Sequence, residues 1–310
     1  KEYRLDISSM LREDEIWAEA GYEVSWEQFE LKNWNLPAEK AGRAFSDVTV
    51  EETDGRIRLS GNGFSYSFDS STGELVSILS DGKEVLSSPL RLNVWRAPLA
   101  NELDGWNAYS AGASRSSGYG SIGHSNTLAA HYYSAGLDNL GQAVASVSTR
   151  AFEGGAAVDV RELILLGGGR GETRQLDQYI SGMSFDGFES IWSYIVYGDG
   201  TVNIRHTVKP QGTMPPYLPR IGVTFGLDGS LSNVQWYGRG PQASYPDRKS
   251  GYRLGIWTST VEDMYEPYLI PQDYGLRTDN RWVRMTDSDG KGVELSVDHL
   301  SNFNAYPYTT

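Results

Sequence analysis

The stretch SIWSYIVYGDGTVNIRHTVKP, residues 190–210, decides the fold class of this chain. In its second half Val202, Ile204 and Val208 alternate with polar residues, which is the period of a strand with one buried face. The sequence Gly-Asp-Gly at residues 198–200 separates the two halves. Short glycine-containing connections between alternating runs are typical of β-hairpins. The stretch therefore predicts two antiparallel strands.

The same alternation recurs along the chain. In IRLSGNGFSYSFD, residues 57–69, Phe64, Tyr66 and Phe68 share one strand face. Further strands are predicted at residues 71–86, with turns at 72–73 and 81–82, at residues 156–166, and after residue 220 in RIGVTFGL, GYRLGIWTST, RWVRMTD and VELSVDH. Helical periodicity is confined to DEIWAEAG and VEDMYEPYL, residues 14–21 and 261–269. Many closely spaced strands predict an all-β protein, a large sandwich or barrel.

Composition limits the classes of partner. The 310 residues carry a net charge of −13, which repels a phosphate backbone, so we expect no nucleic acid. No apolar run reaches the ~20 residues that a membrane span needs, so we expect no membrane partner. The absence of cysteine excludes disulfides and thiolate chemistry. The 9 Trp and 19 Tyr favour a carbohydrate ligand only modestly, because aromatic residues also build the cores of sheets.

Two breaks interrupt the strand pattern. NWNLPAEKAGR, residues 33–43, follows the predicted strand YEVSWEQFEL and has the polar, Pro- and Gly-containing character of a linker, so we place a domain boundary there. The second break, residues 100–126, is long and rich in Gly and Ser. Loops of that length in a compact domain tend to be functional, and we expect this one to be mobile. The chain opens without Met in KEYRLDISSML, and we expect it to be an excised piece of a longer protein.

No motif defines a catalytic centre. GGGRGE, residues 167–172, precedes a polar, strand-like run rather than a helix, which favours a hairpin turn over a dinucleotide site. DSDGKG, residues 287–292, has Lys291 where a calcium loop needs an oxygen ligand, so it is predicted to be a turn. The four histidines lack ligand spacing; His206 shares a strand face with apolar residues, which predicts a hydrogen-bonded core or edge histidine, and His124 lies in the long break.

Special residues are concentrated in WYGRGPQASYPDR, residues 236–248. Gly238 and Gly240 would let the backbone turn tightly, and Pro241 and Pro246 would fix φ. An Asp-Arg pair at residues 247–248 is suited to pairing with neighbouring strands or with an adjoining domain. We interpret the stretch as a rigid structural corner rather than a sugar contact.

Five motifs in order carry a family resemblance. They are NVWRAPLANE (93–102), LPRIGVTFGL (218–227), WYGRGPQASYPDRKSG (236–251), STVEDMYEPYLIPQDYGLRTDNRWV (259–283) and FNAYPYT (303–309). Together they resemble the C-terminal region of large bacterial β-galactosidases of glycoside hydrolase family 2, over nearly the whole chain. The resemblance implies an antiparallel supersandwich related to galactose mutarotases at residues 38–310, truncated at its C-terminal end. At residues 1–37 it implies the last strands of an immunoglobulin-like β-sandwich and a linker.

The activity implied by the resemblance is hydrolysis of terminal non-reducing β-D-galactose with retention. Two glutamates about 5 Å apart perform such chemistry, and in the family both belong to a TIM barrel that also holds magnesium. This region contains no part of that barrel, so the resemblance implies no catalytic residue, no metal ligand and no cofactor here. The implied partner is a β-galactoside or related oligosaccharide in the intact enzyme, which is cytoplasmic or periplasmic and for which homo-oligomerisation stays open.

The resemblance also assigns roles to residues. A loop after the R-A-P motif forms a wall of the family's substrate pocket, and the matching residues are Arg96, Asn101, Glu102, Asp104 and Trp106. Residues of the 236–248 motif and its surroundings are assigned a structural role: Trp236, Gly238, Arg239, Gly240, Pro241, Tyr245, Asp247, Arg248 and Arg277.

Three departures from the family pattern concern polar residues. The usual Asp-Asn-Asp after R-A-P is Ala-Asn-Glu at 100–102, the usual Glu-Asn before Y-P-D-R is Ala-Ser at 243–244, and the usual Glu-Asn of the Pro-Gln motif is Asp-Tyr at 273–274. We interpret these changes as a loss of polar groups near the pocket rim. They predict a preference for a glycoside other than lactose.

Two further functions stay open at this point. An autonomous carbohydrate-binding module would account for the aromatic residues. A mutarotase-like aldose epimerase would use a histidine with a carboxylate, and His124 or His206 would be that histidine. The fragment of a β-galactosidase explains the ordered motifs best.

Overall fold

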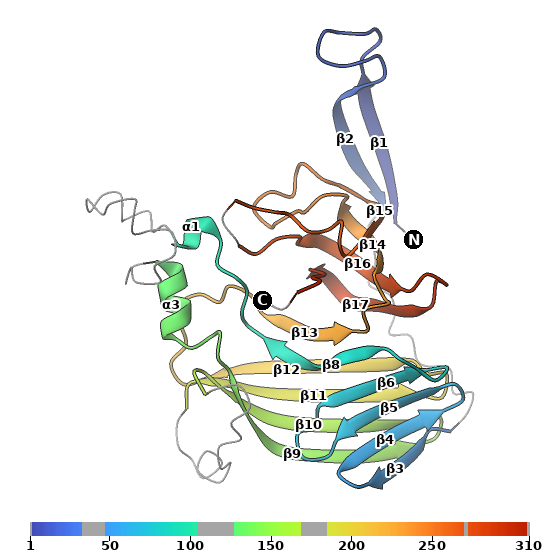
Figure 1. Cartoon of the computed structure of the whole chain (residues 1–310), viewed down its shortest axis with the longest axis vertical. Helices are drawn as coiled ribbons and strands as arrows, with labels where there is room; N and C mark the ends of the chain where they lie inside the picture. The colour runs from blue at the N-terminus through green and yellow to red at the C-terminus, as the bar shows by residue number, and fades with distance from the viewer. Residues whose placement is uncertain (1, 33–46, 104–126, 169–184, 270–271, 309–310) are drawn as a thin grey trace.

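The computed structural model describes residues 2–32, 47–103, 127–168, 185–269 and 272–308. Every strand pair in these ranges is antiparallel, and the strands far outnumber the helices (Figure 1). The prediction of an all-β antiparallel sandwich is therefore confirmed. The predicted linker at 33–43 and the domain boundary after residue 37 lie outside the described residues.

The predicted hairpin at 190–210 is present and forms one edge of a four-stranded sheet. Its strands are β11 (Gly187–Tyr197) and β12 (Val202–Gln211), paired with Tyr194 opposite Ile204 and Trp192 opposite His206. The sheet continues through β10 (Gly155–Leu165) to β9 (Gly141–Phe152). Burial alternates along β11 from Phe188 to Tyr197, as the period-two pattern requires.

A five-stranded sheet packs face to face on this one (Figure 1). Its strands in order are β3 (Thr49–Thr53), β4 (Arg56–Gly61), β5 (Phe64–Asp69), β6 (Leu75–Ser80) and β7 (Lys83–Glu84). Phe68 of β5 and Tyr194 of β11 meet edge to face across the interface, with ring centroids 5.0 Å apart. Because the buried side chains of both sheets form one apolar cluster, this interface is the main core of the protein.

A second layer of strands lies beside this sandwich. β8 (Leu86–Asn93) pairs with β13 (Gly222–Leu227). A four-stranded sheet follows, in the order β15 (Arg253–Thr260), β14 (Asn233–Gly240), β16 (Arg277–Thr286) and β17 (Gly292–Phe303). Its core is centred on the fully buried Trp236 of β14. The predicted turn at residues 287–292 joins β16 to β17, where Asp287 accepts hydrogen bonds from the backbone of Asp289 and Lys291.

A separate hairpin of β1 (Tyr3–Met10) and β2 (Glu23–Lys32) projects from the β15 side of the molecule (Figure 1). Gln28 of β2 exchanges two hydrogen bonds with the backbone of Leu254, and Glu2 accepts from Arg281 and from the Tyr237 hydroxyl. Its opposite face is apolar and exposed, with Tyr3, Leu5, Ile7, Phe29 and Leu31. The hairpin is thus held to the sandwich by polar contacts.

Both predicted helices were wrong. Residues 14–21 form the turn between β1 and β2, and residues 261–269 form turns and extended chain. Within the described residues the helices are instead α1 (Ala100–Leu103) and α3 (Leu128–Ser134). The apolar residues of the first segment lie at the end of a hairpin, and those of the second lie in a loop that packs Met264 into the core around β14. Neither position requires an amphipathic helix.

The reading of Gly238 and Gly240 as tight-turn residues was also wrong. Both lie in β14, paired with β15. A Cβ on Gly238 would stand 2.8 Å from Cγ of Asn280, and one on Gly240 would stand 2.7 Å from the Trp257 indole. The glycines therefore leave room for neighbouring side chains, and the chain changes direction only after them, at the cis Gly240-Pro241 bond.

Candidate functional site

The R-A-P loop ends in a buried ion pair. Glu102 of α1 is only 6% exposed, and both of its oxygens accept from Arg96, Oε2 from Nη1 at 2.7 Å and Oε1 from Nη2 at 2.8 Å. The backbone N–H of Leu99 also donates to Oε2 at 2.8 Å. Burial alone would lower the pKa of Arg96, but the hydrogen bonds and charge of Glu102 outweigh it and raise that pKa.

The same carboxylate reaches the second helix. The hydroxyl of Tyr132, on α3, donates to Glu102 Oε1 at 3.1 Å. Burial, with a smaller contribution from the Glu102 charge, raises the pKa of Tyr132 to about 12. Thr127 caps α3 by accepting from the backbone N–H of Ala130. Glu102 therefore ties together the two helices that precede and follow residues 104–126.

A second buried carboxylate organises the neighbouring loops. Asp273 is 3% exposed and accepts from the hydroxyls of Tyr245, at 3.2 Å, and Tyr306, at 2.7 Å. Arg220 donates to both of its oxygens, at 3.3 and 3.4 Å, and to Asn304 Oδ1 at 2.8 Å. Four motifs that are distant in sequence are thereby joined at one point.

The two networks are connected. The backbone N–H of Ala100, at the start of α1, donates to Gln272 Oε1 at 3.1 Å. Gln272 directly precedes Asp273 in the chain. The position of α1 thus depends on Arg96 and Glu102 on one side and on the 272–273 segment on the other.

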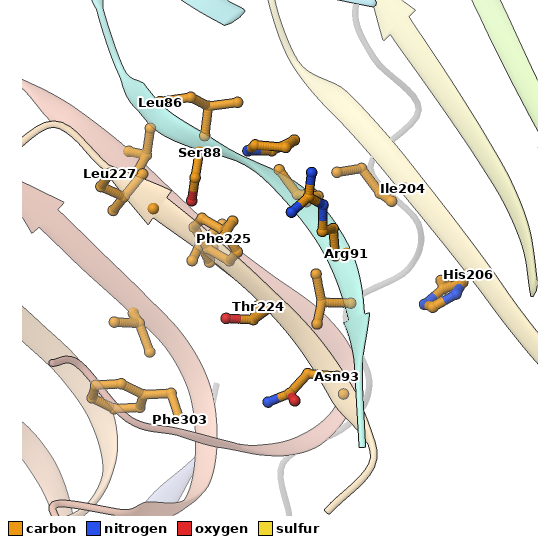
Figure 2. Close-up of a pocket in the computed structure, with 18 of the residues that line it drawn as sticks. Leu86, Ser88, Arg91, Asn93, Ile204, His206, Thr224, Phe225, Leu227 and Phe303 are labelled. Carbon is orange, nitrogen blue, oxygen red and sulfur yellow. The ribbon is translucent and has the colours of Figure 1, made fainter. Parts of the chain in front are cut away.

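A large open cleft adjoins these loops. It has a volume of about 3550 Å³ and is bordered by β8, β12, β13, β17 and the α1 end of the sandwich. Figure 2 shows Arg91 and Asn93 of β8, Thr224 of β13 and His206 of β12 around it. Asn101 and Asp273 border the cleft as well, so the helix end and the strands share one cavity.

His206 is held in place inside this cleft. Its ring stacks on Trp192 with centroids 3.5 Å apart, and its Nε2 lies 2.9 Å from Ser190 Oγ. Ser190 in turn donates to Glu162, a buried carboxylate that also accepts from Trp192 Nε1. The predicted hydrogen-bonded edge histidine is confirmed. Ser190 therefore lies between the imidazole of His206 and the carboxylate of Glu162.

The predicted pocket-wall residues fall into three groups. Arg96 and Glu102 pair with each other inside the structure, and Asn101 lies exposed on α1. Asp104 and Trp106 lie outside the described residues, as do His124 and all but four residues of the break at 100–126. Those four form α1, so this part of the predicted loop is helical.

The structural residues of the 236–248 motif are distributed over two networks. Arg239 pairs with Asp279, and Arg277 lies over the Trp236 ring, whose indole N–H donates to the Arg239 carbonyl. Tyr245 joins the Asp273 network, and Arg248 stacks over Tyr245. Pro241 and Asp247 are exposed.

Two departures from the family pattern have structural consequences that the sequence did not show. Asp273 was interpreted as the loss of a polar group at a rim, but it is a buried acceptor with three donor side chains. Ser244 is fully buried and hydrogen-bonds to Thr278 Oγ1 at 2.9 Å. Arg220 and Tyr306 were not singled out as site residues; the family motifs that contain them were the only available signal.

The described residues offer no metal centre. None of their His, Asp and Glu side chains form a group of three or more that could hold a metal ion. None of the helices in the described ranges has the length and apolar character that a membrane crossing requires.

Comparisons with known proteins define the class of this fold and site. The family model described as "Beta galactosidase small chain" matches residues 60–310, and "Beta-galactosidase, domain 4" matches residues 1–32. The chain therefore belongs to the β-galactosidase small chain family.

Individual relatives agree with this assignment. A β-galactosidase of Priestia megaterium is 30% identical over 309 residues, which are 99% of this chain and 26% of the relative. β-Galactosidases of Vibrio cholerae and Pseudoalteromonas haloplanktis are 28% and 29% identical, over 92% and 90% of the chain and 25% and 24% of their own lengths. The chain thus spans about a quarter of the length of these relatives.

Proposed function

We propose that this chain is the non-catalytic small-chain part of a retaining β-galactosidase and supplies one wall of its substrate pocket. The wall is the α1 end of the sandwich, where Arg96, Asn101 and Glu102 lie together. Asp104 and Trp106, which follow directly in the chain, belong to the same proposed wall. Family membership supports the substrate class, a terminal β-D-galactoside.

The observation that carries the proposal is that the buried carboxylates at the α1 end of the sandwich are already hydrogen-bonded. A retaining glycosidase needs two carboxyl groups about 5 Å apart, one free to donate a proton and one free to attack. Glu102 is bound by Arg96 and Tyr132, and Asp273 by Arg220, Tyr245 and Tyr306. Neither is available for chemistry, which supports a reacting pair in another part of the enzyme.

The magnesium implied by the family resemblance is assigned to that other part as well. The described residues do not fit a magnesium site, because they lack a cluster of oxygen ligands. A mutarotase-like supersandwich and an immunoglobulin-like origin of the β1–β2 hairpin complete the proposal. The exposed apolar face of that hairpin is the face that a sandwich partner would cover.

The test is hydrolysis of o-nitrophenyl β-D-galactoside. The chain alone is expected to be silent. It is then mixed with the Priestia megaterium relative from which the matched quarter has been deleted, and this mixture is expected to turn substrate over. The deleted relative without the chain is the control. Turnover by the chain alone would refute the proposal, since it would require a carboxylate pair within these residues.

A carbohydrate-binding module is the second candidate, favoured by one surface. Tyr265 and Tyr308 are exposed, the latter by 70%, and their rings meet edge to face with centroids 6.3 Å apart. Exposed aromatic rings with polar edges suit the faces of sugars. Calorimetry with galactose and lactose distinguishes the two functions, because millimolar binding by the chain alone, lost in Tyr265→Ala, would support the module.

A further inference from the structure

One buried carboxylate holds both helices at the proposed pocket wall. Glu102 accepts four hydrogen bonds, from Arg96 Nη1 and Nη2, from the Leu99 N–H and from the Tyr132 hydroxyl. We propose that Glu102 is a positioning residue that holds Asn101 against the galactoside, an inference that rests on the proposed function. Asn101 is then the contact, and Glu102 acts through it.

The shortness of α1 makes such a fixing point necessary. The helix has four residues, and its described backbone bonds run from Glu102 and Leu103 to the Leu99 carbonyl. Helices of this length are not stable by themselves, because nucleation costs more than one turn of hydrogen bonds returns. The helix therefore depends on the side-chain bonds of Glu102 and on the contact between Ala100 and Gln272.

Neighbouring residues of α1 differ in exposure. Both border the cleft, but Glu102 is buried in the Arg96 and Tyr132 contacts, whereas Asn101 is exposed. Successive helical residues are turned by about 100°, so fixing Glu102 also fixes the direction of Asn101. An amide can donate to and accept from sugar hydroxyls, which makes Asn101 chemically suited to that contact.

The geometry and charge of the site favour a fixed arrangement. The two bonds from Arg96 form a bidentate pair, which restrains the carboxylate in position and in plane. Arg96 is itself anchored by a bond from Nε to the Pro219 carbonyl at 3.1 Å. The raised pKa of Arg96 agrees with a pair that stays ionised.

Two variants separate positioning from general stability. Tyr132→Phe removes one donor to Glu102 and keeps the Arg96 pair, so the fold should survive. Glu102→Gln removes the charge and leaves Arg96 buried without its partner, which is the stronger perturbation. The matched control is Asp279→Asn, because Asp279 is likewise paired with an arginine, Arg239, but does not line the cleft.

The experiment measures KM and kcat for o-nitrophenyl β-D-galactoside in the assembly of this chain with the complementary part of the Priestia megaterium relative. Tyr132→Phe should raise KM about 3- to 10-fold with kcat within about 2-fold, the effect of one hydrogen bond. Glu102→Gln should raise KM further, and Asp279→Asn should lower the melting temperature without changing KM.

A double-mutant cycle with Asn101→Ala tests whether Glu102 affects KM through Asn101. If Glu102 acts through Asn101, Tyr132→Phe has no further effect on KM once Asn101 is absent. Equal KM increases in both backgrounds would overturn the inference, and so would a KM increase in Asp279→Asn.

Failure of the proposed function is distinguishable from failure of this inference. If the unaltered assembly is inactive, the proposed function is refuted, and amide exchange in the chain alone then decides the positioning role. Faster exchange of the Glu102 and Leu103 amides in Tyr132→Phe than in the unaltered chain would support it. Unchanged exchange of those amides would overturn it.

Discussion

Gly238→Ala tests whether the glycines of the 236–248 motif serve packing. The added Cβ would stand 2.8 Å from Cγ of Asn280 and 3.1 Å from its Cα, and closer still to its Oδ1. Asn280 cannot yield easily, because it is fully buried and its Nδ2 donates to the carbonyls of Arg277 and Ser301. Overpacking of this kind costs about 1–3 kcal/mol, and each lost hydrogen bond about 0.5–1.5 kcal/mol. We therefore expect a loss of about 2–5 kcal/mol.

The assay is thermal unfolding of the chain followed by tryptophan fluorescence. At about 2–4 °C per kcal/mol for large domains, the expected decrease in Tm is about 4–20 °C. Gly222→Ala is the matched control, because Gly222 also lies in a strand and an added Cβ there would meet no atom within 4 Å. A Gly238→Ala protein that melts within about 1 °C of the original would refute the packing argument. An equal decrease in Gly222→Ala would show that glycine itself, rather than the space beside Asn280, is what β14 requires.

Three further predictions concern other parts of the molecule. Burial lowers the pKa of His206 from 6.5 to about 4, so the free energy of unfolding should fall as pH decreases from 6.5 towards 4. His206→Gln should remove this pH dependence, and an NMR titration of His206 near pH 6.5 would contradict the prediction. Burial alone would raise the pKa of Glu2, but hydrogen bonds from Arg4, Tyr237 and Arg281 outweigh burial and lower that pKa. The stabilising contribution of Glu2 is therefore present above its unfolded pKa of about 4.5 and lost as pH falls through the lowered folded value, and proteolysis within β1–β2 should accelerate there and in Glu2→Gln. Tyr66→Phe removes the 2.7 Å hydrogen bond to the Gly200 carbonyl and should lower the free energy of unfolding, measured in urea, by about 1 kcal/mol. An unchanged free energy of unfolding would show that this bond does not stabilise the fold.

Local pattern was sufficient for most strands. The hairpin at 190–210 was predicted because alternation and a Gly-Asp-Gly turn are properties of adjacent residues. His206 was placed correctly for the same reason, since its neighbours on the strand face are read from every second position. Of the described residues, the helices α1 and α3 were missed because four and seven residues are too short for a periodic signal. The first of them is held by tertiary contacts.

The candidate site was predictable only in part. Arg96, Asn101 and Glu102 were named from a motif, but their contrasting environments were not. Glu102 was named for a pocket wall together with Asn101, and the structure shows that it also forms a bidentate pair with Arg96. Whether a carboxylate is free or paired depends on groups such as Tyr132, 30 residues away, and pattern along the chain carries no information about such distances.

By itself the sequence determined the fold class, the main hairpins, the family and the position of the proposed wall, because periodicity and motifs are encoded in consecutive residues. Only the tertiary structure decided what the special residues do. Asp273 is a buried acceptor that joins Arg220, Tyr245 and Tyr306, and Gly238 makes room for Asn280 rather than forming a turn. Both roles arise from the packing of one segment against another, and burial, pairing and available space exist only once the sheets and loops have been brought together.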